Sequence, residues 1–491
     1  MNNKPMLNAY PDSMGTKLSD LVSILSKEAL RDTFSSFYIL PSIYHSDLDR
    51  GFSVIDYELE ETLADRSDLE ELNRLGIDLK LDFILNHASA QSPQFTDLVL
   101  HGEQSEYRDF FINWNDFWNG YGSMTEDGYI QPEQKYLENM FFRKPGLPIL
   151  MVQFPDGKKV PYWNTFYQEE HYPRYLGQMD LNIRSPKVWE FYKETLRKIA
   201  SYGAEIVRLD AFAYAPKAPG QKNFLNEPGT WQLLSQIQEL ADPYHLTLLP
   251  EIHASYEEQI YKKISDKGYM TYDFFLPGLV IDAIENKRST YLAAWARELV
   301  ENNIRVVNML GCHDGIPLLD LKGILPEGDI QNLIELIVDR GGLVKNLHGQ
   351  KNIYYQVNAT YFSALGESEQ KLLMARAIQL FMPGKPQIWY LDLFAGKNDC
   401  EAVRKAGEAG HKEINRTNLT VEQVEEACRK EVVKKQIEMI RFRNTCRAFD
   451  EGAKISIEEK DAVLRIIWQK DTYGAELTVD FLNQSYEIRE M

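Results

Sequence analysis

Three carboxylates and an arginine stand where strand-like segments of the sequence end. The segment Glu205–Leu209 is rich in strand formers, follows a helix-like run and leads directly to Asp210. Arg208 and Asp210 have the same parity, so their side chains leave the predicted strand on one face, with Asp210 just past its end. Glu251 follows a second such segment and Asp314 a third. We therefore expect carboxylates from three strands at one edge of a parallel sheet.

Several carboxylates at one edge suit the hydrolysis or transfer of a glycosyl group. One carboxylate attacks the anomeric carbon, and a second, kept protonated, donates to the leaving oxygen. Further charge stabilises the oxocarbenium-like transition state, and Arg208 would keep Asp210 ionised and oriented. His87 and His313 could instead form a metal pair, but the motifs hold no third His or Cys ligand near them. We therefore favour hydrogen bonding to sugar hydroxyls and expect no metal.

Strand-like segments alternate with helix-like ones along most of the chain. The predicted strands cover residues 6–10, 36–40, 78–85, 205–209, 246–250, 270–275, 304–310 and 387–391. Predicted helices cover residues 17–30, 67–75, 186–201, 231–240, 369–381 and 421–442. Eight strands with helices between them predict an α/β protein with a (β/α)8 TIM barrel, whose chemistry lies at the carboxyl ends of the strands.

Two long gaps and a change of pattern define the other domains. Residues 87–184 and 316–370 are too long to be loops, so we expect inserted subdomains after strands three and seven. Residues 449–491 contain alternating strand patterns that indicate a small C-terminal β domain. The barrel itself is then predicted to comprise residues 1–86, 185–315 and 371–448.

The composition limits the class of partner. The 491-residue chain carries 73 acidic and 54 basic residues, for a formal net charge of −19. This surplus argues against nucleic acid and anionic membranes, since both require a basic surface. The four cysteines show no metal-ligand spacing and favour a reduced, cytoplasmic setting. No apolar run reaches membrane-spanning length. We expect a cytoplasmic monomer or homodimer that acts on small molecules.

The segments Asp82–His87, Gly203–Asp210, Glu251 and His313–Asp314 resemble the four signature regions of the α-amylase superfamily of glycoside hydrolases. Four residues separate Gly203 from Arg208, which is longer than the common spacing, but the Arg-x-Asp motif is intact. Other segments resemble the sucrose phosphorylase branch of that family. These segments are Asp49–Phe52, Ile55–Tyr57, Arg208–Tyr214, Cys312–Ile316, Tyr355–Tyr361, Ser363–Gly366, Ala395–Asp399 and Glu413–Arg416.

The resemblance implies a role for each motif. Asp210 would be the nucleophile, Glu251 the general acid/base and Asp314 the stabiliser of the transition state. Other residues would form the glucose subsite and a mobile acceptor loop. The subsite residues are Asp49, Phe52, His87, Phe166, Gln178, Arg208, His313 and Arg416, and the loop residues are Tyr355 and Gln356.

These roles imply a retaining α-glucosyl phosphorylase of the sucrose phosphorylase type. Glucose would pass from sucrose or a related α-glucoside, through a covalent glucosyl-enzyme, to inorganic phosphate, giving α-glucose 1-phosphate. Phosphate is then a co-substrate, and no cofactor is expected. A hydrolase or transglucosidase on the same fold is the nearest rival. A non-catalytic scaffold is disfavoured by the intact carboxylates.

The sequence departs from the branch in the predicted acceptor subsite. Asn352 and Ile353 replace a Leu-Asp pair whose Asp is expected to bind fructose. Arg143 falls where proline is common, Lys144 falls at the position of an arginine, and His348 adds positive charge. Arg143 and His348 would suit a phosphorylated fructose, as in the related sucrose 6′-phosphate phosphorylases. The branch also includes glucosylglycerol and glucosylglycerate phosphorylases. Neutral drift of flexible loops is the alternative to a different leaving group.

Overall fold

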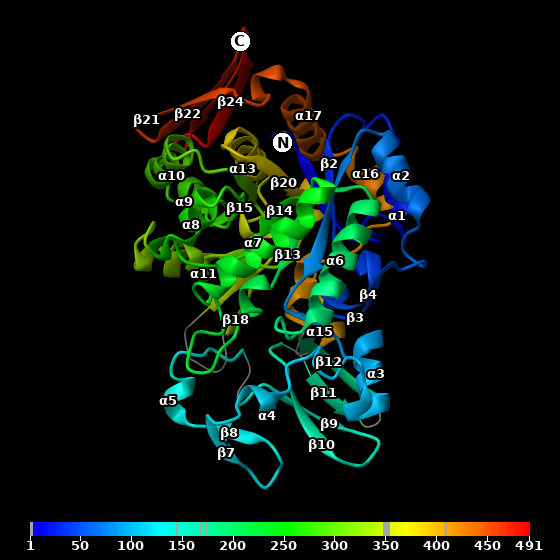
Figure 1. The fold of residues 1–491 in the computed structure, drawn as a ribbon. Coiled ribbons are helices and arrows are strands. Elements are labelled where there is room, and N and C mark those ends of the chain that lie inside the picture. Colours follow the sequence, from blue (N-terminus) through cyan, green and yellow to red (C-terminus); the bar gives the residue numbers. More distant parts are fainter. Residues whose placement is uncertain (1–2, 144–145, 167, 172–173, 347–353, 408–409) are drawn as a thin grey trace. The chain divides into compact units, whose positions relative to one another are not determined.

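The structure is a computed structural model of the 491-residue chain. It describes residues 3–143, 146–166, 168–171, 174–346, 354–407 and 410–491. Strands and helices alternate through most of this part of the chain (Figure 1). The described residues group into two compact units. The first comprises residues 1–39, 67–79 and 253–491, and the second comprises residues 40–66 and 80–252.

Eight strands form one sheet in the order β14-β13-β5-β2-β1-β20-β16-β15. The pairs whose registers are known are all parallel. The strands are β1 (Met6–Ala9), β2 (Ser36–Ile39), β5 (Asp78–Ile84), β13 (Ala204–Asp210), β14 (Thr247–Pro250), β15 (Thr271–Asp273), β16 (Val306–Met309) and β20 (Lys385–Trp389). All eight predicted strands are present, and the predicted (β/α)8 class is confirmed.

The end of strand β13, which carries the predicted nucleophile, differs from the prediction. The sequence placed Asp210 one residue beyond its strand, but β13 includes Asp210 as its last residue. Ile206, Val207 and Leu209 are all buried, although they point to both faces of the strand. This is the burial expected of a parallel strand that is covered on both sides.

The helices between these strands include two that match their predicted bounds, α6 (Pro186–Ser201) and α13 (Glu369–Phe381). The predicted helix 421–442 is two helices, because Lys430 has extended backbone angles at the start of the second. The charge pattern has the same period on both sides of this break and does not reveal it. Further helices are α1 (Leu18–Ser26), α2 (Arg66–Arg74), α7 (Gly229–Ala241), α8 (Ile260–Asp266), α9 (Leu276–Glu285), α10 (Thr290–Glu301), α14 (Tyr390–Leu393), α15 (Cys400–Ala406), α16 (Val421–Ala427) and α17 (Glu431–Thr445).

The segment between β5 and α6 is built from short strands around an aromatic cluster. Its buried centre contains Trp114, Trp118 and Trp163, and the rings of Trp114 and Trp163 are 4.8 Å apart. The indole of Trp114 donates to the carbonyl of Ile130 at 2.8 Å. The elements are β6 (His87–Ser89), α3 (Pro93–His101), α4 (Trp114–Phe117), β7 (Gly122–Met124), β8 (Ile130–Pro132), α5 (Gln134–Leu137), β9 (Ile149–Gln153), β10 (Lys159–Trp163), β11 (Gln168–His171) and β12 (Arg174–Asp180). The hairpin β3 (Tyr44–Leu48) and β4 (Ser53–Leu59) precedes them.

The segment after β16 has its own small sheet and helix. It contains β17 (Ile316–Pro317), α11 (Glu327–Asp339), β18 (Leu343–Asn346), β19 (Tyr354–Asn358) and α12 (Tyr361–Ala364). Strand β19 pairs with both β17 and β18 in antiparallel fashion. The predicted division into a barrel, two inserted subdomains and a C-terminal domain, with its residue bounds, remains a prediction.

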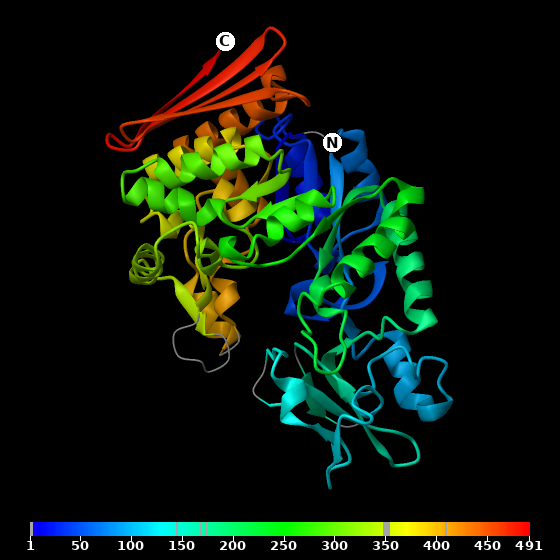
Figure 2. The ribbon, with the colours of Figure 1, turned by 60° about the vertical axis from the view of Figure 1, so that its left-hand side comes forward.

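The C-terminal residues form the expected antiparallel sheet, β21 (Lys454–Lys460), β22 (Val463–Lys470), β23 (Tyr473–Asp480) and β24 (Ser485–Glu490). Figure 2 shows this sheet lying over helices of the same unit, and α10 and α13 contact it. The buried indole of Trp468 donates to the carbonyl of Phe381 at 2.7 Å. Among the described helices, none combines the length and apolar character needed to cross a bilayer.

Candidate active site

The ends of β13 and β14 place two predicted catalytic residues on neighbouring strands. In the parallel register Leu209 lies beside Pro250, and the backbone N–H of Glu251 donates to the carbonyl of Leu209 at 3.3 Å. Asp210 and Glu251 therefore follow paired positions at the carboxyl ends of adjacent strands. This is the edge of a parallel sheet where catalytic groups are usually found.

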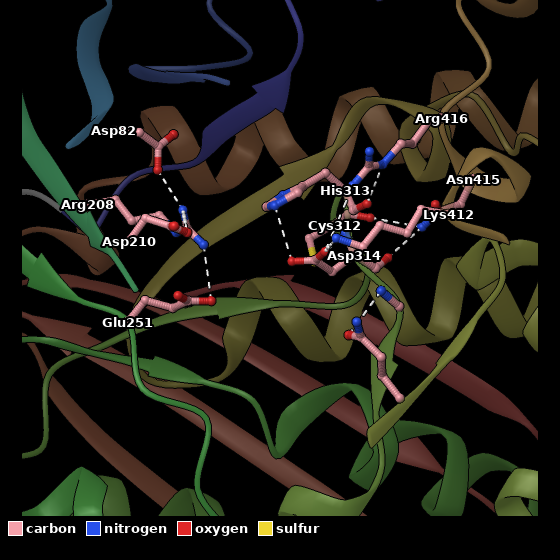
Figure 3. A network of polar contacts seen from close by, with 12 residues as sticks. Asp82, Arg208, Asp210, Glu251, Cys312, His313, Asp314, Lys412, Asn415 and Arg416 are labelled. Carbon is pink, nitrogen blue, oxygen red and sulfur yellow. Dashed lines mark hydrogen bonds and ion pairs between the residues drawn. The ribbon is translucent and has the colours of Figure 1, made fainter. Parts of the chain in front are cut away.

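Arg208 joins three carboxylates from three strands (Figure 3). Its Nη1 contacts Asp82 at 2.6 Å and Asp210 at 2.8 Å, and its Nη2 contacts Glu251 at 3.0 Å. The side chains of Arg208 and Asp82 are buried, whereas those of Asp210 and Glu251 are each 14% exposed. The guanidinium is thus anchored by Asp82 of β5. It holds the two accessible carboxylates in fixed positions. The sequence placed Asp82 in a motif but did not give it this anchoring role.

Backbone strain occurs at two of the predicted site segments. Ala211 directly follows Asp210 and has a φ of 52°. Asp49 and Arg50 have φ values of 47° and 51°, and Gly51 follows at 113°. A β-carbon on Gly51 would collide with the backbone of Ser42, so only glycine fits there. Left-handed non-glycine residues cost free energy and concentrate at functional sites.

Predicted glucose-binding residues of the same unit gather around His87. Its Nε2 lies 3.0 Å from the carbonyl of Phe52, which Gln178 also contacts at 3.2 Å. The ring centroids of His87 and Phe166 are 4.9 Å apart. Burial lowers the pKa of His87, and the carbonyl of Phe52 and the charge of Asp180 only partly oppose this. The ring is therefore neutral near pH 7 and can offer a hydrogen bond without carrying a charge.

A buried ion pair that the sequence did not reveal supports these residues. Lys217 Nζ lies 2.8 Å from Asp180 and 2.9 Å from the amide oxygen of Asn86. Asp180 also accepts from the N–H and hydroxyl of Thr165, at 2.7 and 2.6 Å. Asn86 and Thr165 directly precede His87 and Phe166, so the pair fixes the backbone beside both rings. Lys217 lies in an irregular segment, where no periodic pattern could have indicated it.

In the other unit, the loop after β16 carries His313 and Asp314, and it packs against Asp392 and the backbone of Val357. A β-carbon on Gly311 would collide with the carboxylate of Asp392, and one on Gly315 would meet the carbonyl of Val357 at 2.7 Å. The two glycines therefore let the loop lie directly on its neighbours. This explains the glycines at both ends of the motif in physical terms.

Cations surround Asp314 within this unit (Figure 3). Lys412 Nζ lies 2.8 Å from its Oδ1, Arg416 lies 3.9 Å from the same oxygen, and His313 Nε2 lies 3.1 Å from its Oδ2. Burial alone would raise the pKa of Asp314, but these neighbours hold it well below its ordinary value. Asp314 is therefore ionised throughout the neutral range. Lys412 was not among the predicted site residues.

The thiol of Cys312 also lies in this loop, and the ligand atoms of Cys312, His313 and Asp314 are within 4.8 Å of one another. The expectation that no cysteine stands near the two histidines is therefore wrong, because Cys312 directly precedes His313. The donor set still does not suit a metal cation. Lys412 and Arg416 already place positive charge on the carboxylate, and a divalent ion would be repelled by both.

Of the acceptor candidates, Arg143 is described in full. Its guanidinium lies over the rings of Phe166 and Tyr214, at 5.0 and 5.8 Å from their centroids. Its Nη1 donates to the Tyr214 hydroxyl at 3.1 Å. Gln356 is buried and accepts from the N–H of Gly315 at 3.2 Å. Lys144, His348, Asn352 and Ile353 lie outside the described residues, and Tyr355 is described only as part of β19.

Comparison with known proteins agrees with this fold. The model of the α-amylase catalytic domain matches residues 9–314. The chain is 52% identical to the sucrose 6(F)-phosphate phosphorylase of Ilumatobacter coccineus, covering 99% of this chain and 95% of that protein. It is 32% identical to the sucrose phosphorylase of Streptococcus mutans, covering 99% and 98%. The crystal structure of sucrose 6F-phosphate phosphorylase from Thermoanaerobacter thermosaccharolyticum matches with a TM-score of 0.90 at 35% identity, covering 100% of this chain and 96% of that one.

The barrel topology and the carboxylates at its strand ends are those of a class of proteins that process glycosides. The chain belongs to the α-amylase family and, within it, to the sucrose phosphorylase branch. The resemblance drawn from the motifs is thereby confirmed.

The carboxyl group of Asp392, which lies against Gly311, should make the stability of the protein depend on pH. Burial raises the pKa of Asp392 to about 6 from 3.8, although Arg376 and backbone N–H groups oppose this. The folded state therefore binds a proton at Asp392 that the unfolded state has released. This stabilising contribution is greatest at low pH and is lost as the pH rises to about 6. Asp392→Asn removes the titration. As the pH rises from about 4 to 7, the unfolding free energy of wild type should therefore fall by up to about 3 kcal/mol relative to that of the variant.

Urea unfolding of both proteins across this pH range measures the difference. Asp127→Asn, the same substitution at an exposed turn, is the matched control and should track wild type. A constant difference between Asp392→Asn and wild type would show that Asp392 does not titrate in this range.

Proposed function

We propose that the chain is a retaining α-glucosyl phosphorylase that transfers glucose from a sucrose-type α-glucoside to inorganic phosphate. The observation that carries this proposal is the single guanidinium of Arg208 on Asp210 and Glu251. It presents two accessible carboxylates from neighbouring strands, which is the equipment of retaining glycosyl transfer. The relatives of the branch, named as phosphorylases, supply the expectation that phosphate is the acceptor.

In the first step, Asp210 attacks the anomeric carbon of the glucose. Its Oδ1 is bound by Arg208, so Oδ2 is the oxygen proposed to form the new bond. Glu251 donates its proton to the glycosidic oxygen as the bond from carbon to that oxygen breaks. The products are a β-glucosyl ester on Asp210, an ionised Glu251 and the leaving sugar, whose new hydroxyl carries the proton from Glu251.

In the second step, a phosphate oxygen attacks the anomeric carbon from the opposite face. The ester bond breaks, Asp210 returns as a carboxylate, and Glu251 accepts the proton released by phosphate. Two inversions restore the α configuration, so the product is α-glucose 1-phosphate. Asp314 is the proposed electrostatic stabiliser of the positive charge that develops on the sugar in both steps.

For the leaving group, we propose a fructose that carries a phosphate ester at C6. Arg143 stacks on two aromatic rings in the unit that carries Asp210 and presents a fork of N–H donors, which suits phosphate. The relative at 52% identity bears the name sucrose 6(F)-phosphate phosphorylase. Plain sucrose is the second candidate, because a relative at 32% identity is named for it. The expected cytoplasmic monomer or homodimer remains a prediction.

The function is tested by incubating the purified protein with a panel of α-glucosides, with and without inorganic phosphate. The panel contains sucrose, sucrose 6′-phosphate, glucosylglycerol and glucosylglycerate. Release of α-glucose 1-phosphate that depends on phosphate is the expected result. Release of free glucose at the same rate with and without phosphate would assign a hydrolase instead.

Asp210→Asn should lower turnover by several orders of magnitude, because the amide cannot form the covalent ester. The measurement is the initial rate of glucose 1-phosphate release, with thermal unfolding to show that the variant is folded. Asp266→Asn, at an exposed residue near the end of α8, should be as active as wild type. Substantial activity in a pure Asp210→Asn sample would exclude Asp210 as the nucleophile.

Arg143→Ala should weaken use of the phosphorylated donor selectively. A charge-assisted hydrogen bond contributes roughly 1.5–3 kcal/mol, so KM for sucrose 6′-phosphate should rise on the order of ten- to a hundredfold. KM for sucrose should stay nearly constant. Lys135→Ala removes an exposed cation from the same subdomain and should change neither value. Equal effects of Arg143→Ala on both donors would show that Arg143 does not bind the phosphate ester.

A further inference from the structure

Two adjacent side chains fix the backbone of the loop that carries Asp314. Asn415 Nδ2 donates to the carbonyls of Cys312 and Asp314, at 3.0 and 2.7 Å. Arg416 Nε donates to the carbonyl of His313 at 2.7 Å. Three consecutive carbonyls are therefore bound by two consecutive residues. Asn415 and Arg416 are both buried, so the contacts are shielded from water.

Lys412 adds a contact to the carboxylate itself. It lies in the same short helical segment, Gly410–Asn415, and its ammonium is 2.8 Å from Asp314 Oδ1. The corresponding guanidinium contact from Arg416 is longer, at 3.9 Å. The Lys412 side chain is 24% exposed and that of Asp314 is 20% exposed. Both charges are therefore partly buried but keep some contact with solvent.

We propose that Lys412, with Asn415, is a positioning residue for Asp314 in glucosyl transfer. This inference rests on the proposed function, in which Asp314 stabilises the charged transition state. Asn415 and Arg416 determine where the loop lies, and Lys412 determines the rotamer of the carboxylate by binding Oδ1. The other oxygen, Oδ2, is bound by His313. Electrostatic stabilisation requires a carboxylate that is already oriented and does not reorganise as charge develops.

The charge of Lys412 alone predicts the opposite effect. An ammonium beside a developing cation opposes the stabilisation that Asp314 supplies. If neutralisation were its main effect, removing Lys412 would speed the reaction. If orientation is its main effect, removal slows the reaction. The sign of the change therefore distinguishes the two roles.

The central variant is Lys412→Met, which keeps much of the side-chain volume but removes the charge. We expect kcat for glucose 1-phosphate release to fall on the order of ten- to a hundredfold, the loss corresponding to one charge-assisted hydrogen bond. KM should change by less than about threefold, because the contact is made to Asp314 and not to substrate. Lys412→Arg, which can still bind Oδ1, should recover most of the lost kcat.

Two further variants complete the experiment. Asn415→Ala should lower kcat without a matching rise in KM, because it releases two of the three carbonyls. Lys405→Met removes an exposed lysine of α15 that pairs with Glu401 and should leave both constants at their wild-type values. Thermal unfolding of each variant is measured in parallel. Since Lys412 is partly exposed, its variants should melt close to wild type.

The outcomes separate this inference from the proposed function. If wild type makes no glucose 1-phosphate from any donor in the panel, the proposed function is wrong, and the inference that rests on it falls with it. If wild type is active, an unchanged or increased kcat in Lys412→Met overturns the positioning role. A rise in KM alone also overturns it and assigns Lys412 to substrate binding. A fall in kcat that Lys412→Arg does not restore contradicts orientation through Oδ1.

Discussion

In the second unit, the two carboxyl groups proposed to be catalytic depend on one guanidinium. Arg208 contacts Asp82, Asp210 and Glu251 within 3.0 Å, and these residues come from three adjacent strands. A charged group that is almost fully buried requires partners, and a buried arginine without them would be strongly destabilising. The same contacts that satisfy this requirement also fix the two partly exposed carboxylates. The burial of Arg208 and the orientation of the proposed catalytic groups therefore depend on the same contacts.

The first unit shows the opposite arrangement, in which cationic side chains surround one carboxylate. Asp314 has Lys412, Arg416 and His313 as neighbours, and its pKa is held well below the ordinary value despite burial. Its loop is bound through three successive carbonyls and lies on Asp392 through Gly311. In both units the carboxyl groups are fixed by neighbours before any substrate arrives. Such preorganisation is the main source of electrostatic stabilisation in enzymes.

The strands, and the position of the proposed catalytic residues at their ends, could be predicted because both follow short, regular signals. Buried parallel strands are continuous apolar runs, so a polar residue at the end of one, such as Asp210 or Glu251, is conspicuous. Lys217 lies in an irregular segment, and Lys412 and Asn415 lie in a short helical segment. In both places the neighbours in space are remote in the sequence, and no periodic pattern marks the residues. Lys217, for example, pairs with Asp180, which is distant in the sequence and comes close only when the chain folds. The break between α16 and α17 was missed because apolar and charged residues repeat similarly on both sides.

The central claim is that Asp210 carries glucose during the reaction. Glu251→Gln incubated with α-glucosyl fluoride, without phosphate, tests it most directly. Fluoride leaves without a proton, so the ester should form, while its breakdown should be slow without the general base. Mass spectrometry of the intact protein should show the addition of one glucosyl unit, and the digest should place it on the peptide containing Asp210. A label on any other residue, or no label although wild type consumes the fluoride, would contradict the account.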